Sequence, residues 1–351
     1  MSPSNILIYG SYGYTGTLIV PLAVEAGIRP ILAGRSADKV RPQAKAHGLE
    51  YRVFDLDDPS KVDAGIDGVG VVLHCAGPFS RTARPMAEAC IRKKVHYLDI
   101  TGEIEVFETM AGLGKTAEAA GVMLMPGTGF DVVPSDCLAA HLKRRLPGAT
   151  DLRLAFKAIG RPSRGTATTM IENLHKGGMI RSEGNLVTVP AAWKTREIDF
   201  GDGPVTAMTI PWGDVSTAYY STGIPNIMVY MAAPPEIRFM SIFGRYFGFV
   251  LGSGPVQSFL KKQIQAGPPG PSDAERESGK SLLWGEALDD NDNFVESRLI
   301  TPEGYTLTAK TALEISRRVS EGQFRAGFMT PSMMFGADFI LEFDGVTRTD
   351  I

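Results

Sequence analysis

The chain has 351 residues, of which 44% are hydrophobic, and a formal net charge of -3. This length exceeds one typical domain, so we expect two domains, each with its own core. Lys and Arg are scattered along the chain and provide no basic field, which argues against nucleic acid as a partner. The three cysteines, Cys75, Cys90 and Cys137, show no Cys-x-x-Cys spacing, and no signal peptide precedes Ile6. We therefore expect a reduced, cytoplasmic protein.

The first third of the chain alternates short apolar runs with segments of helical periodicity. This order is typical of parallel strands joined by helices that cover both faces of a sheet. The sequence predicts a doubly wound α/β domain of the Rossmann type over 1–132. The expected strands are 6–9, 31–33, 51–54, 69–75, 97–100 and 122–125, and the expected helices are 16–26, 37–47, 59–64, 82–94 and 106–120.

The remainder reads as an α+β domain with a mixed sheet over 133–305. A helix is expected at 134–146, and the acidic stretch 289–293 is expected to turn a hairpin. Helices at 306–320 and 331–340 should return, so that 306–351 completes the first domain. The expected strands are 152–159, 186–189, 207–210, 216–220, 227–231, 282–288 and 294–300.

One apolar segment, 239–260, has the length of a membrane span but contains Arg245, Pro255 and several glycines. A spanning helix needs about 20 predominantly apolar residues, so we expect no transmembrane segment. Two interpretations stay open. The segment is either a partly buried pair of helices or an apolar flap in peripheral contact with a membrane or a lipid substrate.

A glycine-rich turn follows the first expected strand and precedes the first expected helix. Glycines at this spacing let the backbone approach a pyrophosphate, while the helix N-terminus faces the anion. The position inside a β-α-β unit makes this weak motif informative. The turn therefore predicts a dinucleotide site, with expected contacts from Gly10, Tyr12, Gly13, Tyr14, Thr15 and Gly16.

Arg35 stands after the second strand, where NAD-binding proteins usually carry an acidic residue. A guanidinium beside Ser36 can bind a 2′-phosphate through its planar fork, so the expected cofactor is NADP(H). The alternative is that Arg35 stacks on an adenine ring. Asp55, after the third strand, is expected either to contact the adenine edge or to cap the helix that follows.

Ligands of doubly wound sheets lie across the carboxyl ends of the strands, so the loops after strands four to six should surround the nicotinamide. Glu103 and Asp131 are carboxylates in these loops, and either could donate a proton or cap the helix that follows it. Phe130 is expected at the substrate. The expected cofactor contacts in these loops are Ala76, Gly77, Pro78, Phe79, Thr101 and Gly102.

Two other kinds of active site are excluded by the residue pattern. A short-chain dehydrogenase needs a Tyr with a Lys four positions later, and no Tyr in the chain has one. The five histidines show no paired spacing and no H-E-x-x-H occurs, so we expect no metal site.

Taken together, the ordered motifs carry a resemblance to a known family. They are the glycine-rich start, A-G-R at 33–35, A-G-P-F at 76–79, Y-L-D-I-T-G-E at 97–103 and G-F-D-V-V-P-S-D at 129–136, with L-W-G at 283–285 and E-G-Y at 303–305 in the second half. The chain resembles the saccharopine dehydrogenase-like oxidoreductases, and within them the bacterial trans-acting enoyl reductases. Ser11 and His74 depart from the residues common in that family.

The resemblance implies a Rossmann domain joined to an α+β domain that often forms a homodimer, and NADP-linked reduction of a C=C or C=N bond. A substrate rich in carboxylates would need cations such as Arg161, Arg164 and Lys176. Because the second domain is otherwise apolar and aromatic, we expect an enoyl reductase acting on a hydrophobic, acyl-chain substrate. The alternatives are imine reduction of an amino-acid-derived small molecule, or a sensor or scaffold that binds NADP(H) without turnover.

Overall fold

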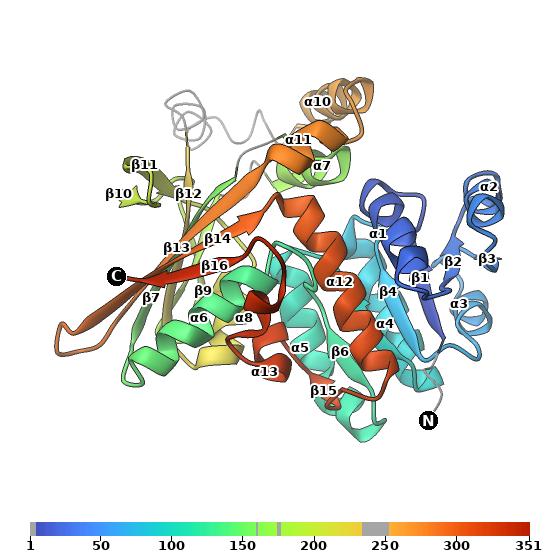
Figure 1. The fold of residues 1–351 in the computed structure, drawn as a ribbon, viewed down its shortest axis with the longest axis horizontal. Helices are drawn as coiled ribbons and strands as arrows, with labels where there is room; N and C mark the ends of the chain where they lie inside the picture. Colours follow the sequence, from blue (N-terminus) through green and yellow to red (C-terminus); the bar gives the residue numbers. More distant parts are fainter. Residues whose placement is uncertain (1–4, 159–160, 174–176, 234–252) are drawn as a thin grey trace. The chain divides into compact units, whose positions relative to one another are not determined.

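The computed structural model describes residues 5–158, 161–173, 177–233 and 253–351. The chain forms two compact units (Figure 1). Unit 1 contains Met1–Val133 and Tyr305–Phe335, and unit 2 contains Pro134–Gly304 and Gly336–Ile351. Most of the apolar segment 239–260 and all of Lys176 lie outside the described residues.

Unit 1 is built on a parallel sheet of seven strands in the order β15-β6-β5-β4-β1-β2-β3. Six of them follow the order 3-2-1-4-5-6 of doubly wound dinucleotide-binding folds. Strands β1, β2 and β4 are buried along their whole length, because helices cover both faces of the sheet. The expected fold class is confirmed. The strands are β1 Ile6–Tyr9, β2 Ile31–Gly34, β3 Tyr51–Val53, β4 Val71–His74, β5 His96–Asp99, β6 Met123–Met125 and β15 Gly327–Phe328.

The helices of unit 1 end where the sequence supplies a left-handed residue or a break. Gly48 closes α2 at φ 62°, and Lys94 closes α4 at φ 57°. Helix α4 buries Ala83, Met86 and Cys90, which share one face at helical spacing. The helices are α1 Tyr14–Glu25, α2 Ala37–His47, α3 Pro59–Gly65, α4 Phe79–Lys93, α5 Ile104–Ala119, α12 Gly304–Ser320 and α13 Pro331–Phe335.

Unit 2 is built on a mixed sheet in the order β10-β11-β12-β7-β13-β14-β16, with the β8–β9 hairpin attached to β12. Only β12 and β7 run parallel to each other. The hairpin around 289–293 is confirmed, since Leu288 pairs with Phe294. The strands are β7 Asp151–Ala158, β8 Gly178–Ser182, β9 Asn185–Val189, β10 Thr195–Asp199, β11 Pro204–Thr209, β12 Asn226–Ala232, β13 Lys280–Leu288, β14 Phe294–Pro302 and β16 Thr347–Asp350.

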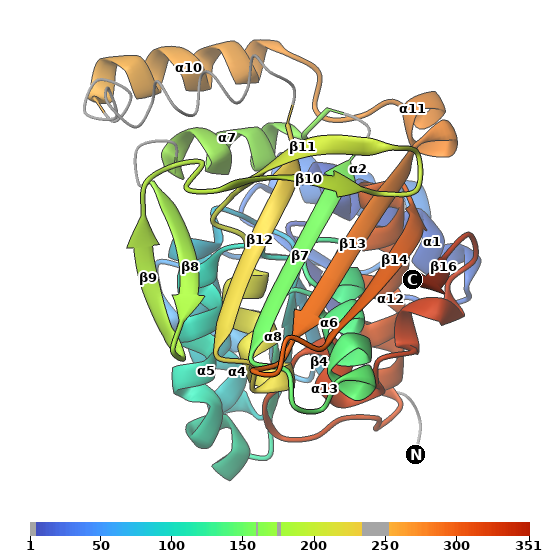
Figure 2. The ribbon, with the colours of Figure 1, turned by 90° about the vertical axis from the view of Figure 1, so that its left-hand side faces the viewer.

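The two faces of this sheet are covered differently. Helix α6 (Val133–Arg145) packs closely at Gly285, where a Cβ would lie 2.7 Å from Leu142 Cδ1. On the other face, Figure 2 shows the β10–β11 hairpin crossing the strands. Its residues Ile198 and Phe200 share a buried cluster with Trp284 of β13. In the motif L-W-G, Trp284 therefore packs on the face covered by the β10–β11 hairpin, and Gly285 lies on the face covered by α6.

The expected strand at 216–220 is wrong, because this segment lies inside α8 (Asp214–Thr222). Its Thr and Tyr residues favour strands. The segment is nevertheless helical, and Gly223 ends the helix in the left-handed conformation at φ 71°. Val215 and Ala218 are fully buried in the helix. Packing of this helical face overrides the local preference.

The chain end also differs from the expectation. The helix expected at 331–340 is split into α13 and a 3₁₀ turn at Phe339–Glu342, and residues 336–351 belong to unit 2 rather than to the first domain. The physical reason is that β16 pairs with β14.

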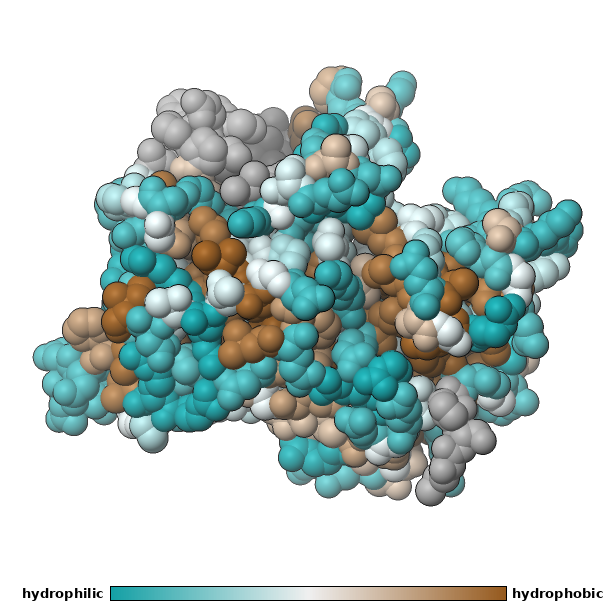
Figure 3. All heavy atoms as spheres, in the orientation of Figure 1, coloured by the Kyte–Doolittle hydropathy of each residue, from teal (hydrophilic) through white to brown (hydrophobic). Residues whose placement is uncertain are grey.

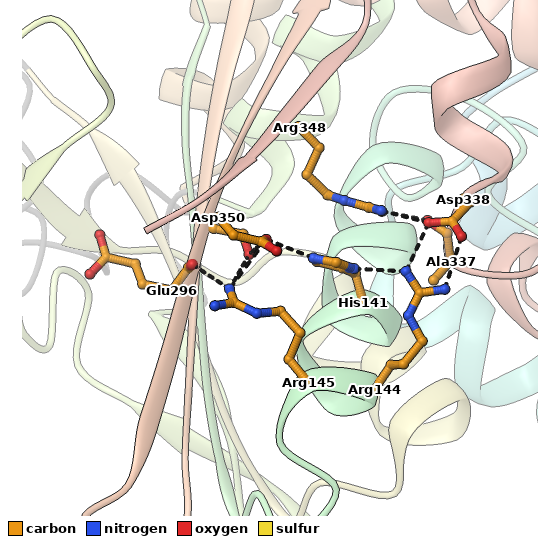
Figure 4. Close-up of polar contacts among 9 residues, drawn as sticks. His141, Arg144, Arg145, Glu296, Ala337, Asp338, Arg348 and Asp350 are labelled. Carbon is orange, nitrogen blue, oxygen red and sulfur yellow. Dashed lines mark hydrogen bonds and ion pairs between the residues drawn. The ribbon is translucent and has the colours of Figure 1, made fainter.

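Side chains reinforce the attachment of this tail (Figure 4). His141 Nε2 of α6 lies 2.8 Å from Asp350 Oδ1, and Arg144 donates to Asp338 at 2.9 Å. Arg348 of β16 also donates to Asp338, at 2.5 Å. The hydrogen bonds from Arg144 and Arg348 hold the pKa of Asp338 well below its usual range. The tail is therefore tied to β14 by backbone pairing and to α6 by polar and charged side chains.

The remaining helices of unit 2 are α7 Arg164–Asn173, α10 Gly254–Ala266 and α11 Asp273–Ser278. Helix α10 lies beside α7, with Gln257 donating to the carbonyl of Ile171 at 2.9 Å. Figure 3 shows hydrophilic side chains interrupted by apolar groups over the visible face. Among the described residues, no helix has the length and apolar character needed to cross a membrane.

Candidate functional site

The glycine-rich turn at the carboxyl end of β1 requires its glycines for two reasons. Gly10 has φ 82°, and a Cβ there would lie 2.8 Å from Ala76 Cβ in the loop after β4. A Cβ on Gly16 would lie 2.4 Å from the carbonyl oxygen of Ser11. Helix α1 can therefore approach the turn only with glycine at this position. The turn has the close backbone approach that a pyrophosphate cradle needs.

The start of α1 is suited to an anion. Gly13 is its N-cap, and no side chain caps the helix, so its first amides are not satisfied by a cap. Tyr14 and Tyr305 meet edge to face with ring centroids 5.0 Å apart. Tyr12 packs on Gly34 at the end of β2, where a Cβ would lie 2.5 Å from Tyr12 Cε1. Half-buried Thr15 lies in the first turn of the helix.

Arg35 lies at the carboxyl end of β2 with its side chain exposed. Within the described part of the chain it has no hydrogen-bond or ion-pair partner. Ser36 is the N-cap of α2, but its hydroxyl makes no capping bond. Lys39 Nζ lies 5.6 Å from the centre of the Tyr12 ring, one turn along α2. Two cations, a hydroxyl and a helix N-terminus thus gather where a 2′-phosphate would bind.

Asp55 follows β3, and its capping alternative is wrong. The residue that caps α3 is Asp58, whose carboxylate accepts from the amide of Ser60 at 2.9 Å. Asp55 instead accepts from the amide of Asp57 at 3.3 Å and pairs with Lys61 at 3.5 Å in an exposed contact. Its role at the adenine edge stays a prediction.

Three loops at the carboxyl edge of the sheet carry the expected nicotinamide contacts. We name them L4 (75–78), L5 (100–103) and L6 (126–132), after β4, β5 and β6. L4 contains the cis peptide between Gly77 and Pro78, and its Ala76 carbonyl accepts from Thr82 Oγ1 at 2.7 Å. The close contact between Ala76 and Gly10 places L4 directly against the glycine-rich turn.

Glu103 of L5 caps a helix, but not the one that follows it. Its Oε1 accepts from the amide of Phe79 and its Oε2 from the amide of Ser80, both at 2.9 Å. The carboxylate therefore binds the N-terminus of α4, which begins after L4, and makes no side-chain cap on α5. Both oxygens are engaged as acceptors, so the geometry favours a structural role over proton donation.

Asp131 of L6 lies against Gly102 of L5. A Cβ on Gly102 would lie 2.6 Å from Asp131 Oδ2 and 3.1 Å from its Cγ. Glycine at 102 thus makes room for the carboxyl group. Burial raises the pKa of Asp131 to about 7. A carboxyl group with this pKa is protonated in an appreciable fraction of molecules at neutral pH.

L6 is anchored to helix α12. The amide of Phe130 donates to Thr308 Oγ1 at 2.9 Å, and Thr311 Oγ1 donates to the carbonyl of Thr128 at 2.8 Å. A Cβ on Gly129 would lie 2.7 Å from Thr308 Cγ2. The return of α12 to unit 1 therefore fixes the loop that carries both Phe130 and Asp131.

The expected substrate cations lie in unit 2 and are engaged there. Arg161 pairs with Glu275 at 2.7 Å, and Arg164 donates to the carbonyl of Gly267 from Nε at 2.9 Å. These partners occupy the groups that would otherwise bind a substrate carboxylate. The structure thus brings together the expected residues of unit 1, while Arg161 and Arg164 join loops within unit 2.

Two further buried polar residues lie at the same edge; sequence reasoning missed Asp99 and noted His74 only as a departure from the residue common in the resembling family. Asp99 ends β5 and accepts three hydrogen bonds, and His74 ends β4 with no partner for either ring nitrogen among the described residues. Burial lowers the pKa of His74 to about 3, so the imidazole is neutral. In the sequence, the feature that could have identified both residues is a polar side chain at the last position of a largely apolar strand. Among the described residues no group of three or more potential ligands could hold a metal ion.

Comparison with known proteins agrees with this geometry. Residues 6–125 match the family of the saccharopine dehydrogenase NADP binding domain. A trans-acting enoyl reductase of Mycobacterium leprae is 36% identical over 158 residues, covering 42% of this chain and 38% of that protein. A saccharopine dehydrogenase-like oxidoreductase of Homo sapiens is 24% identical over 177 residues, covering 45% of this chain and 41% of that protein. The alignments thus span well under half of each relative.

Among solved structures, apo saccharopine dehydrogenase (L-Glu forming) from Saccharomyces cerevisiae has a TM-score of 0.66 and 11% sequence identity. The match covers 99% of this chain and 100% of that chain, and it shows a shared fold. The resemblance read from the motifs is confirmed. Residues 6–125 match the NADP-binding domain of the saccharopine dehydrogenase type, and the rest of the chain is similar to a saccharopine dehydrogenase in fold alone.

Proposed function

We propose that the protein is an NADPH-dependent reductase that transfers hydride to the activated C=C bond of an enoyl, hydrophobic substrate. The observation that carries the proposal is the carboxyl group of Asp131, raised to a pKa of about 7 and held against Gly102 at the carboxyl edge of a dinucleotide-binding sheet. Reduction of a polarised double bond needs a proton as well as a hydride, and a carboxyl group with this pKa can supply it.

The residues of unit 1 would hold the cofactor along the sheet edge. The turn from Gly10 to Gly16 would receive the pyrophosphate at the start of α1. Arg35, Ser36 and Lys39 would bind the 2′-phosphate, and Asp55 the adenine edge. NADPH supplies the hydride when it is bound. The selectivity for NADPH over NADH rests on Arg35, whose guanidinium is exposed and has no partner among the described residues.

Asp131 would deliver the proton to the carbon or oxygen that becomes basic as hydride arrives. Burial favours its protonated form, so an appreciable fraction of molecules carries the proton at neutral pH, and the group ionises on transfer. Glu103 would not share this role, since both its oxygens accept amide hydrogens from α4. Phe130, next to Asp131 on L6, would contact the apolar part of the substrate.

Two observations favour an enoyl substrate over an imine derived from an amino acid. The curated relative from Mycobacterium leprae is named a trans-acting enoyl reductase. Arg161 and Arg164, the residues expected to bind substrate carboxylates, already have partners within unit 2. A substrate with several carboxylates would have to compete for these cations.

The test is NADPH consumption by the purified protein with two panels of compounds. One panel contains enoyl thioesters and lipid-like enones, and the other contains imines formed from oxo acids and amines. The proposal expects turnover with the first panel. Turnover with the second panel alone would assign imine reduction. Cofactor binding without turnover on either panel would support a sensor or scaffold instead.

A homodimer in the cytoplasm is a further part of the proposal, supported by the family resemblance and by three cysteines without disulfide spacing. Sedimentation equilibrium would test the dimer. A peripheral membrane contact through 239–260 falls mostly on residues outside the described part of the chain.

A further inference from the structure

We infer that Asp99 is a positioning residue that, together with Glu103, sets the three loops on the nicotinamide side of the cofactor site. The inference rests on the proposed binding of NADPH to unit 1. It assigns to Asp99 no contact with cofactor or substrate; the residue acts through L4, L5 and L6.

Asp99 is fully buried at the last position of β5 and joins two loops with one oxygen. Its Oδ1 accepts from the amide of Thr101 in L5 and from the amide of Gly127 in L6, both at 2.9 Å. Its Oδ2 accepts from the hydroxyl of Tyr97 at 2.7 Å. One carboxylate thus fixes the separation between L5 and L6.

The backbone of Asp99 adds a second connection to L6. Its carbonyl oxygen accepts from the amide of Thr128 at 2.7 Å and from Thr128 Oγ1 at 2.8 Å. Gly127, the first of the two adjacent anchored positions, has φ 75°. The first turn of L6 is therefore held by Asp99, and Asp131 follows four residues later, against Gly102 of L5.

L5 carries the connection on to L4. The hydroxyl of Thr101 accepts from the amide of Glu103 at 3.0 Å, and Glu103 in turn binds the amides of Phe79 and Ser80. The N-terminus of α4 therefore lies at the end of a continuous series of hydrogen bonds that starts at L6. We call the two carboxylates of Asp99 and Glu103 the loop brace (Figure 1 shows the elements that it joins).

Burying a carboxylate costs desolvation free energy, and an apolar side chain of similar size would fill the same space without this cost. Burial raises the pKa of Asp99 to about 6 although three donors favour its ionised form. The groups that face it are Tyr97, Cys75 and Glu103, and the neighbouring His74 is neutral. Retaining such a group is best explained by the geometry that it imposes on L5 and L6.

The experiment compares two ligands that report on different ends of the cofactor site. Adenosine 2′,5′-bisphosphate reaches only the glycine-rich turn and Arg35, whereas NADPH also reaches the braced loops. Both affinities are measured by titration calorimetry, and the fluorescence of bound NADPH reports on the surroundings of the nicotinamide. None of these readouts requires catalysis, so failure of the reductase proposal leaves the test intact.

We expect Asp99→Ala to weaken NADPH at least about 10-fold and to shift its bound fluorescence, while adenosine 2′,5′-bisphosphate changes less than about 2-fold. Asp99→Asn keeps an oxygen for Thr101 and Gly127 and should restore NADPH binding. Asp63→Ala, which removes an exposed partner of Arg92 in the same unit, is the matched control and should change neither affinity.

Equal losses for both ligands in Asp99→Ala would overturn the inference, because they would indicate general damage to unit 1. Unchanged NADPH binding and fluorescence would overturn it as well. If Asp99→Ala does not fold, the test is made with Glu103→Ala. This variant removes the other carboxylate of the loop brace, and Glu103 is less buried than Asp99. It should reproduce the selective loss of NADPH, and a loss shared by both ligands would refute the brace.

Discussion

Asp131 and Gly102 lie so close together that a single methyl group at residue 102 would collide with the Asp131 carboxyl group, 2.6 Å from Oδ2. Two loops that are 29 positions apart in the chain thus share one small space at the edge of the sheet. At this position burial raises the pKa of the Asp131 carboxyl group to about 7.

The first prediction concerns the pH dependence of turnover. The pKa of Asp131 is raised to about 7, so the group is protonated below that value and ionised above it. Because the proposed step consumes its proton, kcat should be constant at low pH and fall about tenfold per pH unit above pH 7. Asp131→Asn should abolish this limb and most of the activity. A variant with an unchanged profile would remove Asp131 from the mechanism.

The same shift predicts how stability depends on pH. The folded-state pKa of Asp131 lies above its ordinary value of 3.8, so the native state favours the protonated form. Its contribution to the free energy of unfolding is therefore greatest at low pH and declines as pH rises from about 4 to about 7. Asp131→Asn should flatten this decline in urea titrations, and an identical pH dependence in the variant would contradict the shift.

A pair of glycine substitutions tests the close approach of α1 to the glycine-rich turn. Gly16→Ala forces a Cβ against the Ser11 carbonyl and should cost about 1–3 kcal/mol of unfolding free energy and weaken NADPH binding. Gly112→Ala is the control, because a Cβ there meets nothing within 4 Å on helix α5. It should stabilise the protein by about 0.5–1 kcal/mol. Urea unfolding measures both, and tolerance of Gly16→Ala would refute the packing argument.

Cofactor choice is tested at Arg35. Arg35→Ala should raise the Kd for NADPH about 10- to 100-fold and leave that for NADH nearly unchanged, because only NADPH carries the 2′-phosphate. Arg41→Ala, on the helix α2 that follows Arg35, is the matched control, since Arg41 donates to the Tyr51 hydroxyl at 3.1 Å. Equal losses for both cofactors at Arg35 would instead indicate stacking on adenine.

Unit 2 offers an independent test of stability. Glu286 is 6% exposed and accepts hydrogen bonds at 2.6 Å from both Arg153 and Arg196. Glu286→Gln removes the charge that both guanidinium groups share and should cost about 2–4 kcal/mol. The exposed pair of Lys157 and Asp202 is the control, and Asp202→Asn should cost less than about 1 kcal/mol. Similar costs for the two changes would show that Glu286 is effectively solvated.

The sequence was sufficient for six strands of the sheet of unit 1, because they are short runs between helices of clear periodicity, but it did not indicate the two-residue seventh strand β15. It failed at α8, where buried packing outweighed the strand preference of residues such as Thr217. It also failed at the tail, since no local pattern indicates that β16 pairs with β14 across a long stretch of chain.

Within the site, local reasoning identified the loops but not the partners of their side chains. Glu103 was expected either to donate a proton or to cap the helix that follows it, and in the structure its carboxylate accepts from the amide of Phe79, 24 positions earlier in the chain. Asp99 was overlooked because a polar residue at a strand end resembles an ordinary turn residue. Such pairings depend on tertiary contacts that spacing within one segment does not encode.

The measurement that tests the central claim most directly is the fate of hydrogen from the cofactor. The protein is incubated with NADPH deuterated at C4 of the nicotinamide and, in separate reactions, with the enoyl panel and the imine panel, and the products are analysed by mass spectrometry. Our account predicts a reduced product that carries one deuterium in the wild type and is formed at a strongly reduced rate in Asp131→Asn. Bound NADPH that never transfers its deuterium to any member of either panel would contradict the assignment as a reductase.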